Sequence, residues 1–401
     1  MNKQNPPLLF LFTTLLIDFI GFGLIIPIMP KLIQEVSGRS LDYAAQIGGF
    51  LSLCFSLMQF IFAPILGGLS DRFGRRPIIL LSLLGLGIDY ILLAMAPSLL
   101  YLFIGRCFAG ITSASYATAQ AYISDVTPPE NRVQKFGLVE AALGLGVIIG
   151  PLIGGFFGQF GTRIPFFIAA GLSLTNVVIG FIVLPESLSM KNRRRFEWKR
   201  SNPLGYIFKL NKYSFLKPIL ATLFLIFLAS HSIQSIWSYY SIEKFSWSEA
   251  KIGYSLVFFG LVMCLVQSFC IKPIVYRFGE KKAVFFGLLL YIISYSLLGF
   301  SYSAWIFLLS IIPYCIAGIS GPAMQSIVMS KIPQNEYGEV QGILSGVSSL
   351  AAIFGPWIMT QIFSCFINKN SIINFAGAPF IFSMFLICIA LVLTRNFIKI
   401  K

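Results

Sequence analysis

Charged side chains inside otherwise apolar stretches are the feature of this sequence best suited to chemistry. Four of them interrupt apolar runs in the first half of the chain: Asp18, Asp89, Arg106 and Glu140. A charge in such a run is costly to bury, so each is a candidate for binding a ligand or a proton. The second half is almost bare of such charges, and its main titratable candidate is His231, the only histidine. We therefore expect any proton-carrying acid in the first half.

Asp18 lies well inside the first apolar run and is followed by Gly21 and Gly23. An acid that faces a cavity can bind a cation or hold a proton, because burial and nearby positive charge set its proton affinity. The alternative is an acid that caps or latches the end of its helix. The depth of Asp18 in its run favours the functional interpretation.

Arg106 and Asp89 each allow two interpretations. Arg106 keeps its charge, so it can act on a facing acid or anchor an anionic group. It can equally form a structural ion pair with Asp18 or Asp89. Asp89 itself could shape a cavity or simply pair with another polar group.

Glu140 lies about one turn inside its run, where an ion pair with Arg132 or Arg76 is favoured over contact with a substrate. Further polar candidates are glutamines, each of which a helix–helix hydrogen bond would also explain: Gln120, Gln267 and Gln325. His231, Gln234 and Trp237 share a helical face, which would suit an apolar cavity with few polar groups. The aromatic residues that follow are expected in an interfacial belt: Tyr239, Tyr240 and Trp247.

The elements that hold these residues are transmembrane helices. The chain has 401 residues, of which 57% are hydrophobic and 11% charged, so one soluble core cannot bury its apolar surface. We predict an all-α polytopic membrane protein whose twelve spans cover residues 8–30, 43–66, 77–96, 99–124, 135–158, 164–184, 216–240, 250–275, 283–300, 303–330, 338–364 and 373–394. The first run is too long for a signal peptide, so we expect a retained helix.

Several classes of function are disfavoured. The seven cysteines lack metal-ligand spacing and are interpreted as small buried apolar residues. With one histidine and no G-x-x-x-x-G-K-[ST] pattern, the sequence predicts no metal, no cofactor and no enzyme activity.

The basic residues follow the positive-inside rule. The net charge is +15, and twenty-three of the 30 lysines and arginines fall in alternate segments that include both termini. This places both termini in the cytoplasm and favours anionic lipid, not nucleic acid, as the partner of the basic residues.

A polar stretch between the second and third runs reads G-x-L-S-D-R-x-G-R-R-P from Gly67 to Pro77. We expect Gly67 to allow close helix approach, Gly74 to permit a turn, and Asp71 to accept hydrogen bonds from backbone N–H groups or an arginine of a neighbouring helix. Such a loop could latch the cytoplasmic side, although its arginines could also serve topology alone. The predicted gating residues are Gly67, Asp71, Arg72, Gly74, Arg75, Arg76 and Asp125.

A glycine-rich segment in the fifth run predicts a flat, closely packed helix face. Its members are Gly144, Gly146, Gly150, Pro151, Gly154 and Gly155, and the proline should bend the helix.

Short repeats divide the chain. Residues 72–74 (Arg-Phe-Gly) recur at 277–279, and 150–151 (Gly-Pro) recur at 355–356. We therefore predict two homologous six-helix halves, 1–185 and 216–401, joined by a basic cytoplasmic linker, 186–215. Tyr276 stands at the position of Asp71, so the latch should be stronger in the first half.

These motifs resemble the major facilitator superfamily, and most closely its drug:proton antiporters of the tetracycline efflux type. The resemblance implies two six-helix halves around a central substrate site. In the family that these motifs resemble, the glycine-rich segment is associated with antiport, and the motif that contains Arg106 is associated with proton transfer. Two departures matter: where tetracycline exporters carry an intramembrane histidine and an acid, this chain aligns Met263 and Tyr291. That disfavours magnesium–tetracycline as substrate.

The resulting hypothesis is a monomeric antiporter of a bacterial-type inner membrane. It would export a small amphipathic molecule against inward proton flow, with Asp18, helped by Arg106, as the coupling site. A metabolite or siderophore transporter is the alternative, and a non-transporting receptor or scaffold is a third.

Overall fold

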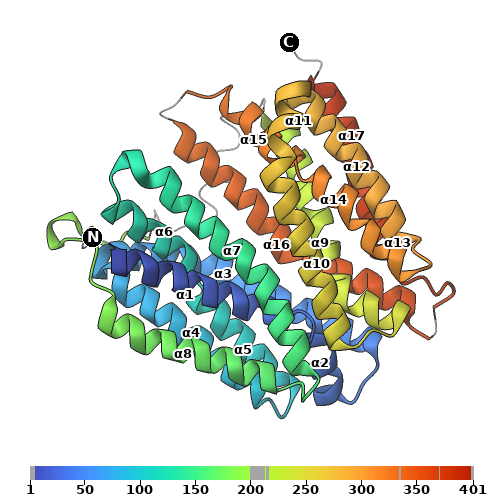
Figure 1. The fold of residues 1–401 in the computed structure, drawn as a ribbon, viewed down its shortest axis with the longest axis horizontal. Helices are drawn as coiled ribbons and strands as arrows, with labels where there is room; N and C mark the ends of the chain where they lie inside the picture. Colours follow the sequence, from blue (N-terminus) through green and yellow to red (C-terminus); the bar gives the residue numbers. More distant parts are fainter. Residues whose placement is uncertain (1–4, 199–212, 214–215, 334–335, 370, 399–401) are drawn as a thin grey trace. The chain divides into compact units, whose positions relative to one another are not determined.

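The computed structural model describes residues 5–198, 213, 216–333, 336–369 and 371–398, and the regular secondary structure in these ranges is helical (Figure 1). Within them, 11 helices are long and apolar enough to cross a membrane, or 12 if one bent pair counts as a single span. The predicted all-α polytopic architecture is therefore confirmed. The described residues form two compact units.

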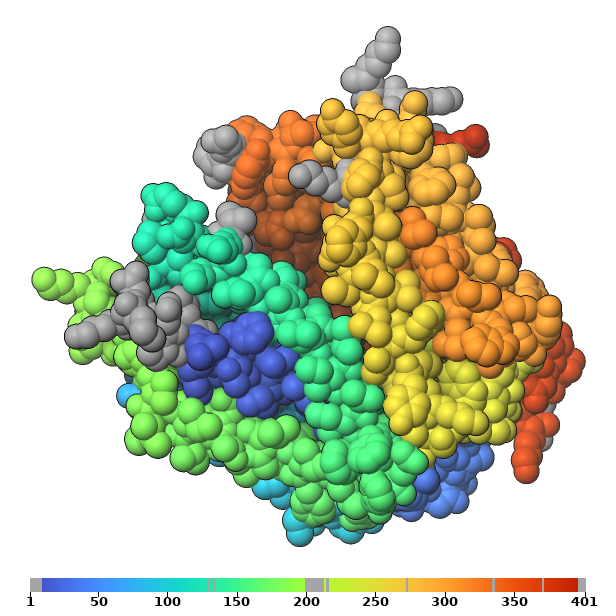
Figure 2. Space-filling view, in the orientation of Figure 1, coloured from blue at the N-terminus to red at the C-terminus, as the bar shows by residue number. Residues whose placement is uncertain are grey.

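The first unit comprises residues 1–38, 54–203 and 248–257. Its described helices are α1 (Asn5–Ile25), α2 (Met29–Ser37), most of α3 (Leu41–Phe73), α4 (Arg75–Ala94), α5 (Leu99–Thr112), α6 (Ser115–Val126), α7 (Pro129–Gly158), α8 (Ile164–Val183), the short 3-10 helix η1 (Met190–Asn192) and the start of α10 (Glu249–Phe269). Along its exposed side, α1 reaches the surface as a blue strip between α7 and α8 (Figure 2).

The second unit comprises residues 39–53, 204–247 and 258–401. Its described helices are the start of α3, α9 (Lys217–Phe245), the rest of α10, α11 (Ile271–Phe278), α12 (Glu280–Gly299), α13 (Ala304–Leu309), α14 (Ile311–Ala317), α15 (Ser320–Met329), α16 (Tyr337–Ile367) and α17 (Ala378–Ile398). The two predicted six-helix halves stay a prediction. Most of the predicted linker, and the residues 1–4 and 399–401 at the termini, lie outside the described residues.

The first predicted span is broken and continues beyond its predicted end. A bend of 54° separates α1 from α2, and α2 runs on to Ser37. Pro27 and Pro30 stand at the break, where neither can donate a backbone hydrogen bond. The end predicted at Pro30 is therefore wrong, because a proline in the first turn of a helix is compatible with a new helix.

Three glycines pack α7 closely against α1. Gly146, Gly150 and Gly154 recur every four residues and so share one face of α7. A methyl group on Gly150 would lie 2.5 Å from the carbonyl oxygen of Ile20, and one on Gly154 would collide with the carbonyl of Leu24. The flat glycine face thus sets the distance between α7 and the helix that carries Asp18.

The rest of the glycine-rich segment behaves differently. Gly155 faces the start of α10, where a methyl group would lie 3.0 Å from the Cα of Gly253, and Pro151 lies within the helix. Gly144 has nothing within 4 Å of the position of an added Cβ. The prediction of close packing is wrong for Gly144, because no neighbouring atom would touch a side chain at that position.

This difference gives a matched pair of variants. We expect Gly150→Ala to lower the midpoint of thermal unfolding, since overpacking costs about 1–3 kcal/mol. Gly144→Ala should leave the midpoint unchanged or raise it slightly, because alanine favours a helix over glycine by about 1 kcal/mol. Circular dichroism of the purified proteins in detergent measures both. Equal midpoints for the two variants would contradict the packing described above.

The second unit repeats two of these local features. Gly355 in α16 lies against the His231 ring of α9, as Gly150 in α7 lies against α1. Gly279 has a φ of 75° at the turn between α11 and α12, and Gly74 has a φ of 111° at the turn between α3 and α4. Both turns therefore need a residue without a side chain, which explains why the Arg-Phe-Gly sequence recurs.

Candidate functional site

Asp18 lies in the second half of α1, and both of its carboxylate oxygens are buried. Two hydroxyl groups come from neighbouring helices: Tyr90 of α4, which interacts electrostatically with Asp18, and Ser115 of α6. Neither carboxylate oxygen makes a hydrogen bond of normal geometry. The Tyr90 hydroxyl also lies against Gly21, so glycine at that position makes room for it. A buried carboxylate without a paired cation is costly unless it holds a proton.

Arg106 and Asp89 form a buried ion pair. The guanidinium of Arg106 in α5 donates to Asp89 Oδ2 in α4, and the Asp89 side chain has no exposed surface. The guanidinium also lies 5.6 Å from the ring centre of Phe55. Of the two interpretations for each residue, the structure favours the ion pair. The expected help of Arg106 to Asp18 has no contact to support it, because Arg106 is directed to Asp89.

Asp89 nevertheless influences the surroundings of Asp18 indirectly, through the residue that follows it in the sequence, Tyr90. Tyr90 follows Asp89 in α4, so the residue that anchors Arg106 and the residue beside Asp18 are adjacent. A side chain on Gly105 of α5 would lie 2.8 Å from Asp89 Oδ1, which shows how closely α5 approaches α4 here. The ion pair therefore fixes the helix that presents Tyr90 to Asp18.

Glu140 does not form the predicted ion pair. It accepts a hydrogen bond of 3.0 Å from the Tyr116 hydroxyl. Arg132 donates instead to backbone carbonyls of α6 and its C-cap, and Arg76 donates to the carbonyl of Phe181. Both arginines find carbonyls nearer in the fold than Glu140, which the sequence alone could not reveal.

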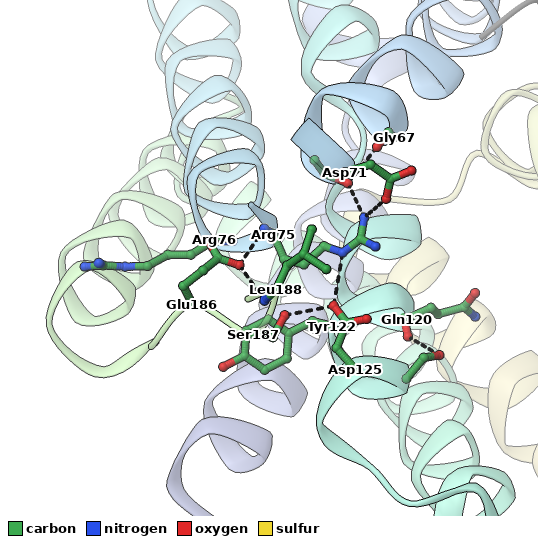
Figure 3. A network of polar contacts seen from close by, with 12 residues as sticks. Gly67, Asp71, Arg75, Arg76, Gln120, Tyr122, Asp125, Glu186, Ser187 and Leu188 are labelled. Atoms are coloured by element: carbon green, nitrogen blue, oxygen red, sulfur yellow. Dashed lines mark hydrogen bonds and ion pairs between the residues drawn. The ribbon is translucent and has the colours of Figure 1, made fainter. Parts of the chain in front are cut away.

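The polar stretch from Gly67 to Pro77 forms a network centred on Arg75, which Figure 3 shows. The Arg75 guanidinium forms ion pairs with Asp71 at 2.6 Å and with Asp125 at 3.2 Å, and it donates a hydrogen bond to the Ser70 hydroxyl at 2.6 Å. Ser187 donates to the same Asp125 oxygen at 3.0 Å. The network thus joins α3, α4, α6 and the segment after α8, all in the first unit.

Glu186 is the member of this network that sequence reasoning missed. Its carboxylate accepts backbone hydrogen bonds from Arg75 at 2.8 Å and Arg76 at 3.2 Å, at the first turn of α4 (Figure 3). Negative charge at a helix N-terminus is stabilising, because the first N–H groups lack partners within the helix. Glu186 is 110 residues from Arg76, so no local pattern indicates the contact. The one available signal was its place in a Pro-Glu-Ser sequence that ends a span.

The residues between Gly67 and Pro77 only partly take the roles predicted for them, and Glu186 accounts for one difference. We expected Asp71 to accept from backbone N–H groups or from an arginine; it binds Arg75, while Glu186 caps the backbone. Gly74 makes the turn as expected, and a Cβ there would collide with Glu186. Gly67 is not at a close helix contact, since nothing lies within 4 Å of its Cβ position. Arg72 lies over the ring of Phe73.

We expect Glu186→Gln to lower the free energy of unfolding by about 1–2 kcal/mol, because the neutral amide loses the charge that stabilises the helix N-terminus. Glu243→Gln, in an exposed position at the end of α9, is the matched control. Thermal unfolding of the two variants in detergent gives the comparison. A Glu186 variant as stable as the control would show that the cap contributes little.

The helical face predicted for His231, Gln234 and Trp237, which lies on α9, does not line one cavity. Trp237 is fully buried, with its ring centre 4.3 Å from that of Phe307, whereas Gln234 is exposed and the His231 ring packs against Gly355. The interfacial belt is also wrong for Tyr239 and Tyr240. Both are buried, and their hydroxyl groups donate to carbonyls of other helices of the second unit, Ala44 in α3 and Leu298 in α12. Helical periodicity places residues on a face but does not show what covers it.

The remaining polar candidates do not gather at one site, and Gln267 is exposed on α10. Gln325 donates to Gln341 at 3.0 Å between α15 and α16, which fits the simple helix–helix interpretation. The Gln120 carbonyl accepts from Ser124. Of the seven cysteines, Cys315 is buried, four are half-buried, and Cys264 and Cys365 are exposed, so the prediction of buried cysteines is wrong for these last two.

Tyr291 belongs to a cluster of tyrosines in which Tyr291 and Tyr295 are buried and Tyr314 is partly buried. Its ring centre lies 6.0 Å from that of Tyr295 and 5.2 Å from that of Tyr314. In the described residues, no group of three or more His, Cys, Asp and Glu side chains could hold a metal ion. Tyr291 therefore lies in an aromatic environment.

Two units of spanning helices with a buried, unpaired acid define a multi-pass membrane transporter. The family model of the Major Facilitator Superfamily matches residues 11–356 and 219–399, and the chain belongs to this family. It is 35% identical to the class C tetracycline resistance protein of Escherichia coli over 388 residues, which cover 96% of each chain.

A second relative is named for multidrug resistance. Multidrug resistance protein 2 of Bacillus subtilis (strain 168) is 28% identical over 405 residues, covering 98% of this chain and 96% of that protein. Among solved structures, a bacterial homolog of the human lysosomal transporter Spinster has a TM-score of 0.77 at 17% identity, with 100% and 99% of the two chains covered. That likeness shows the fold.

Proposed function

We propose that this protein is a proton-coupled antiporter that exports a small amphipathic molecule. The proton gradient supplies the energy, and no cofactor takes part. The observation that carries the proposal is the Asp18 carboxylate, buried in α1 beside the hydroxyl groups of Tyr90 and Ser115 and without an ion pair to any described residue. The relatives named for tetracycline resistance and multidrug resistance support export as the direction.

Asp18 can couple proton entry to substrate export because it can hold either a proton or a cationic group of the substrate, but not both. Protonation removes the negative charge that would attract the substrate, and binding of the substrate favours loss of the proton. The hydroxyl groups of Tyr90 and Ser115 can stabilise the ionised carboxylate once it is reached by water. Competition at one site is then sufficient for antiport.

The Arg75 network is proposed to be a structural part of the gate at the cytoplasmic end of the first unit. The excess of lysine and arginine in alternate segments supports this orientation, with both termini in the cytoplasm. The bacterial relatives support location in the inner (plasma) membrane. We propose that the transporter acts as a monomer, since each chain carries its own coupling acid.

The proposed substrate is bound without a metal ion. Met263 and Tyr291 occupy the positions at which the tetracycline exporters would carry a histidine and an acid, and neither carries a charge at neutral pH. A metal–drug chelate would need charged or nitrogen ligands there. An amphipathic organic molecule with a basic group fits Asp18 better.

Energised inside-out membrane vesicles test this function. Addition of a transported compound should release protons from the vesicle interior, seen as recovery of the fluorescence of a pH-gradient probe. A panel of cationic dyes, drugs and siderophore-like metabolites should include compounds that act only when the protein is present. If uptake assays then detect transport of a compound that never moves protons, the antiport proposal is wrong.

A further inference from the structure

We infer that the second unit carries a binding site for one anionic diacyl phospholipid, in a groove where α11, the start of α12 and the end of α17 meet. These three helix ends lie together near the C-terminal end of the chain in Figure 1. The groove has a volume of about 560 Å³. Transport does not enter into this inference, which depends only on the groove and its charges.

Three cations stand at the groove. Lys281 and Lys282 come from the first turn of α12, and Arg395 from the last turn of α17. All three side chains belong to exposed residues, and none of them forms an ion pair within the described residues. Three unpaired positive charges within one groove create a local potential that favours an anion.

The neighbouring acid does not neutralise this charge. Glu280 precedes Lys281 in the chain, but its carboxylate accepts a hydrogen bond of 2.5 Å from Ser326 of α15. Glu280 is absent from the residues that line the groove, and the remaining lining residues are apolar. Charge complementarity therefore points to an anionic ligand.

The apolar wall identifies that anion as a lipid. Phe278, Phe286 and Leu289 line the groove and are 53%, 45% and 38% exposed. Leu289 lies eight residues beyond Lys281 on α12, which is about 12 Å along the helix axis. A soluble phosphate would leave this wall unused, whereas the acyl chains of a phospholipid would cover it.

The depth of the cations in the spans agrees with this assignment. The candidate span on α12 begins at Glu280, and that on α17 ends at Arg395, so the cations stand at span ends where lipid headgroups lie. The apolar wall continues from there towards the middle of the span. Basic pockets between transmembrane helices in this position bind the headgroups of anionic lipids.

Binding of fluorescent phosphatidylglycerol to the full-length protein in uncharged detergent tests the site. We expect saturable binding of one phosphatidylglycerol, and binding of phosphatidylcholine with the same acyl chains about a hundredfold weaker. The triple variant Lys281→Gln, Lys282→Gln, Arg395→Gln should lose about a hundredfold in affinity for phosphatidylglycerol, since each cation contributes about fivefold.

Two further variants test whether the position of the cations and the apolar wall each contribute to lipid binding. Lys191→Gln, Arg194→Gln, Arg195→Gln removes the same charge from exposed cations outside the groove and should leave binding unchanged. Leu289→Trp keeps the cations but fills the apolar wall, and should weaken binding.

Three results would overturn the assignment. The first is an equal loss of affinity for phosphatidylglycerol in both triple variants, and the second is an equal affinity of the unchanged protein for phosphatidylglycerol and phosphatidylcholine. The third is displacement of the lipid by millimolar glycerol phosphate, which would indicate a site for a soluble anion.

Discussion

Asp18→Asn is expected to abolish proton-coupled export while the protein still inserts in the membrane. The amide has almost the shape of the carboxylic acid, so the packing of α1 against α4, α6 and α7 should be preserved. It cannot bind and release a proton, however, and it offers no charge to a cationic substrate. Export measured in energised vesicles should fall to the background of vesicles without the protein.

The control for Asp18→Asn is an acid outside the site. Glu243→Gln removes the same charge from an exposed position on α9 and should transport normally. Membrane insertion is checked by size-exclusion chromatography of the solubilised proteins. Normal export by the Asp18 variant would remove Asp18 from the coupling site, whatever the behaviour of the control.

The second large effect concerns the buried ion pair. Asp89→Asn should lower the free energy of unfolding by about 3–5 kcal/mol, because it leaves the Arg106 charge buried without its partner. Arg106→Met should cost a similar amount for the opposite reason. The double variant should be more stable than either single variant, since it leaves no unpaired charge. Thermal or denaturant unfolding of the four proteins in detergent forms the cycle.

A partly exposed ion pair provides the comparison. Lys31 of α2 lies 2.8 Å from Glu249 at the start of α10, and the Lys31 side chain is 47% exposed. Lys31→Gln should cost less than about 1 kcal/mol, because water replaces the lost partner. If the Asp89 and Arg106 variants behave like Lys31→Gln, or if their effects simply add, the pair is not a structural anchor.

Sequence reasoning predicted the class of fold and the types of polar residue, because these depend on composition and local pattern. The spans followed from hydrophobic length, and the turn at Gly74 from a glycine between two runs of charge. The position of Asp18 inside its run was enough to make it a candidate. None of these predictions needed to know which helices are neighbours.

Apart from the end of the first span, the failures involve contacts between segments or the burial of a helix face. Glu186 reaches α4 from the end of α8, and Glu140 binds Tyr116 in preference to an arginine. Gly144 and Gly150 have similar local sequences, but only Gly150 faces α1. Trp237 shares a helical face with Gln234, yet one is buried and the other exposed. Pairing and burial depend on which surface each helix turns to its neighbours, and a single sequence does not contain that information directly.

Substrate-driven proton movement in proteoliposomes tests the central claim most directly. Purified protein is reconstituted with a substrate found in the vesicle panel, and a substrate gradient is imposed without any pH gradient. We expect protons to move against the substrate in wild-type liposomes, and no proton movement with Asp18→Asn. Substrate flow without opposite proton flow in the wild type, or unchanged proton flow in the variant, would contradict antiport through Asp18.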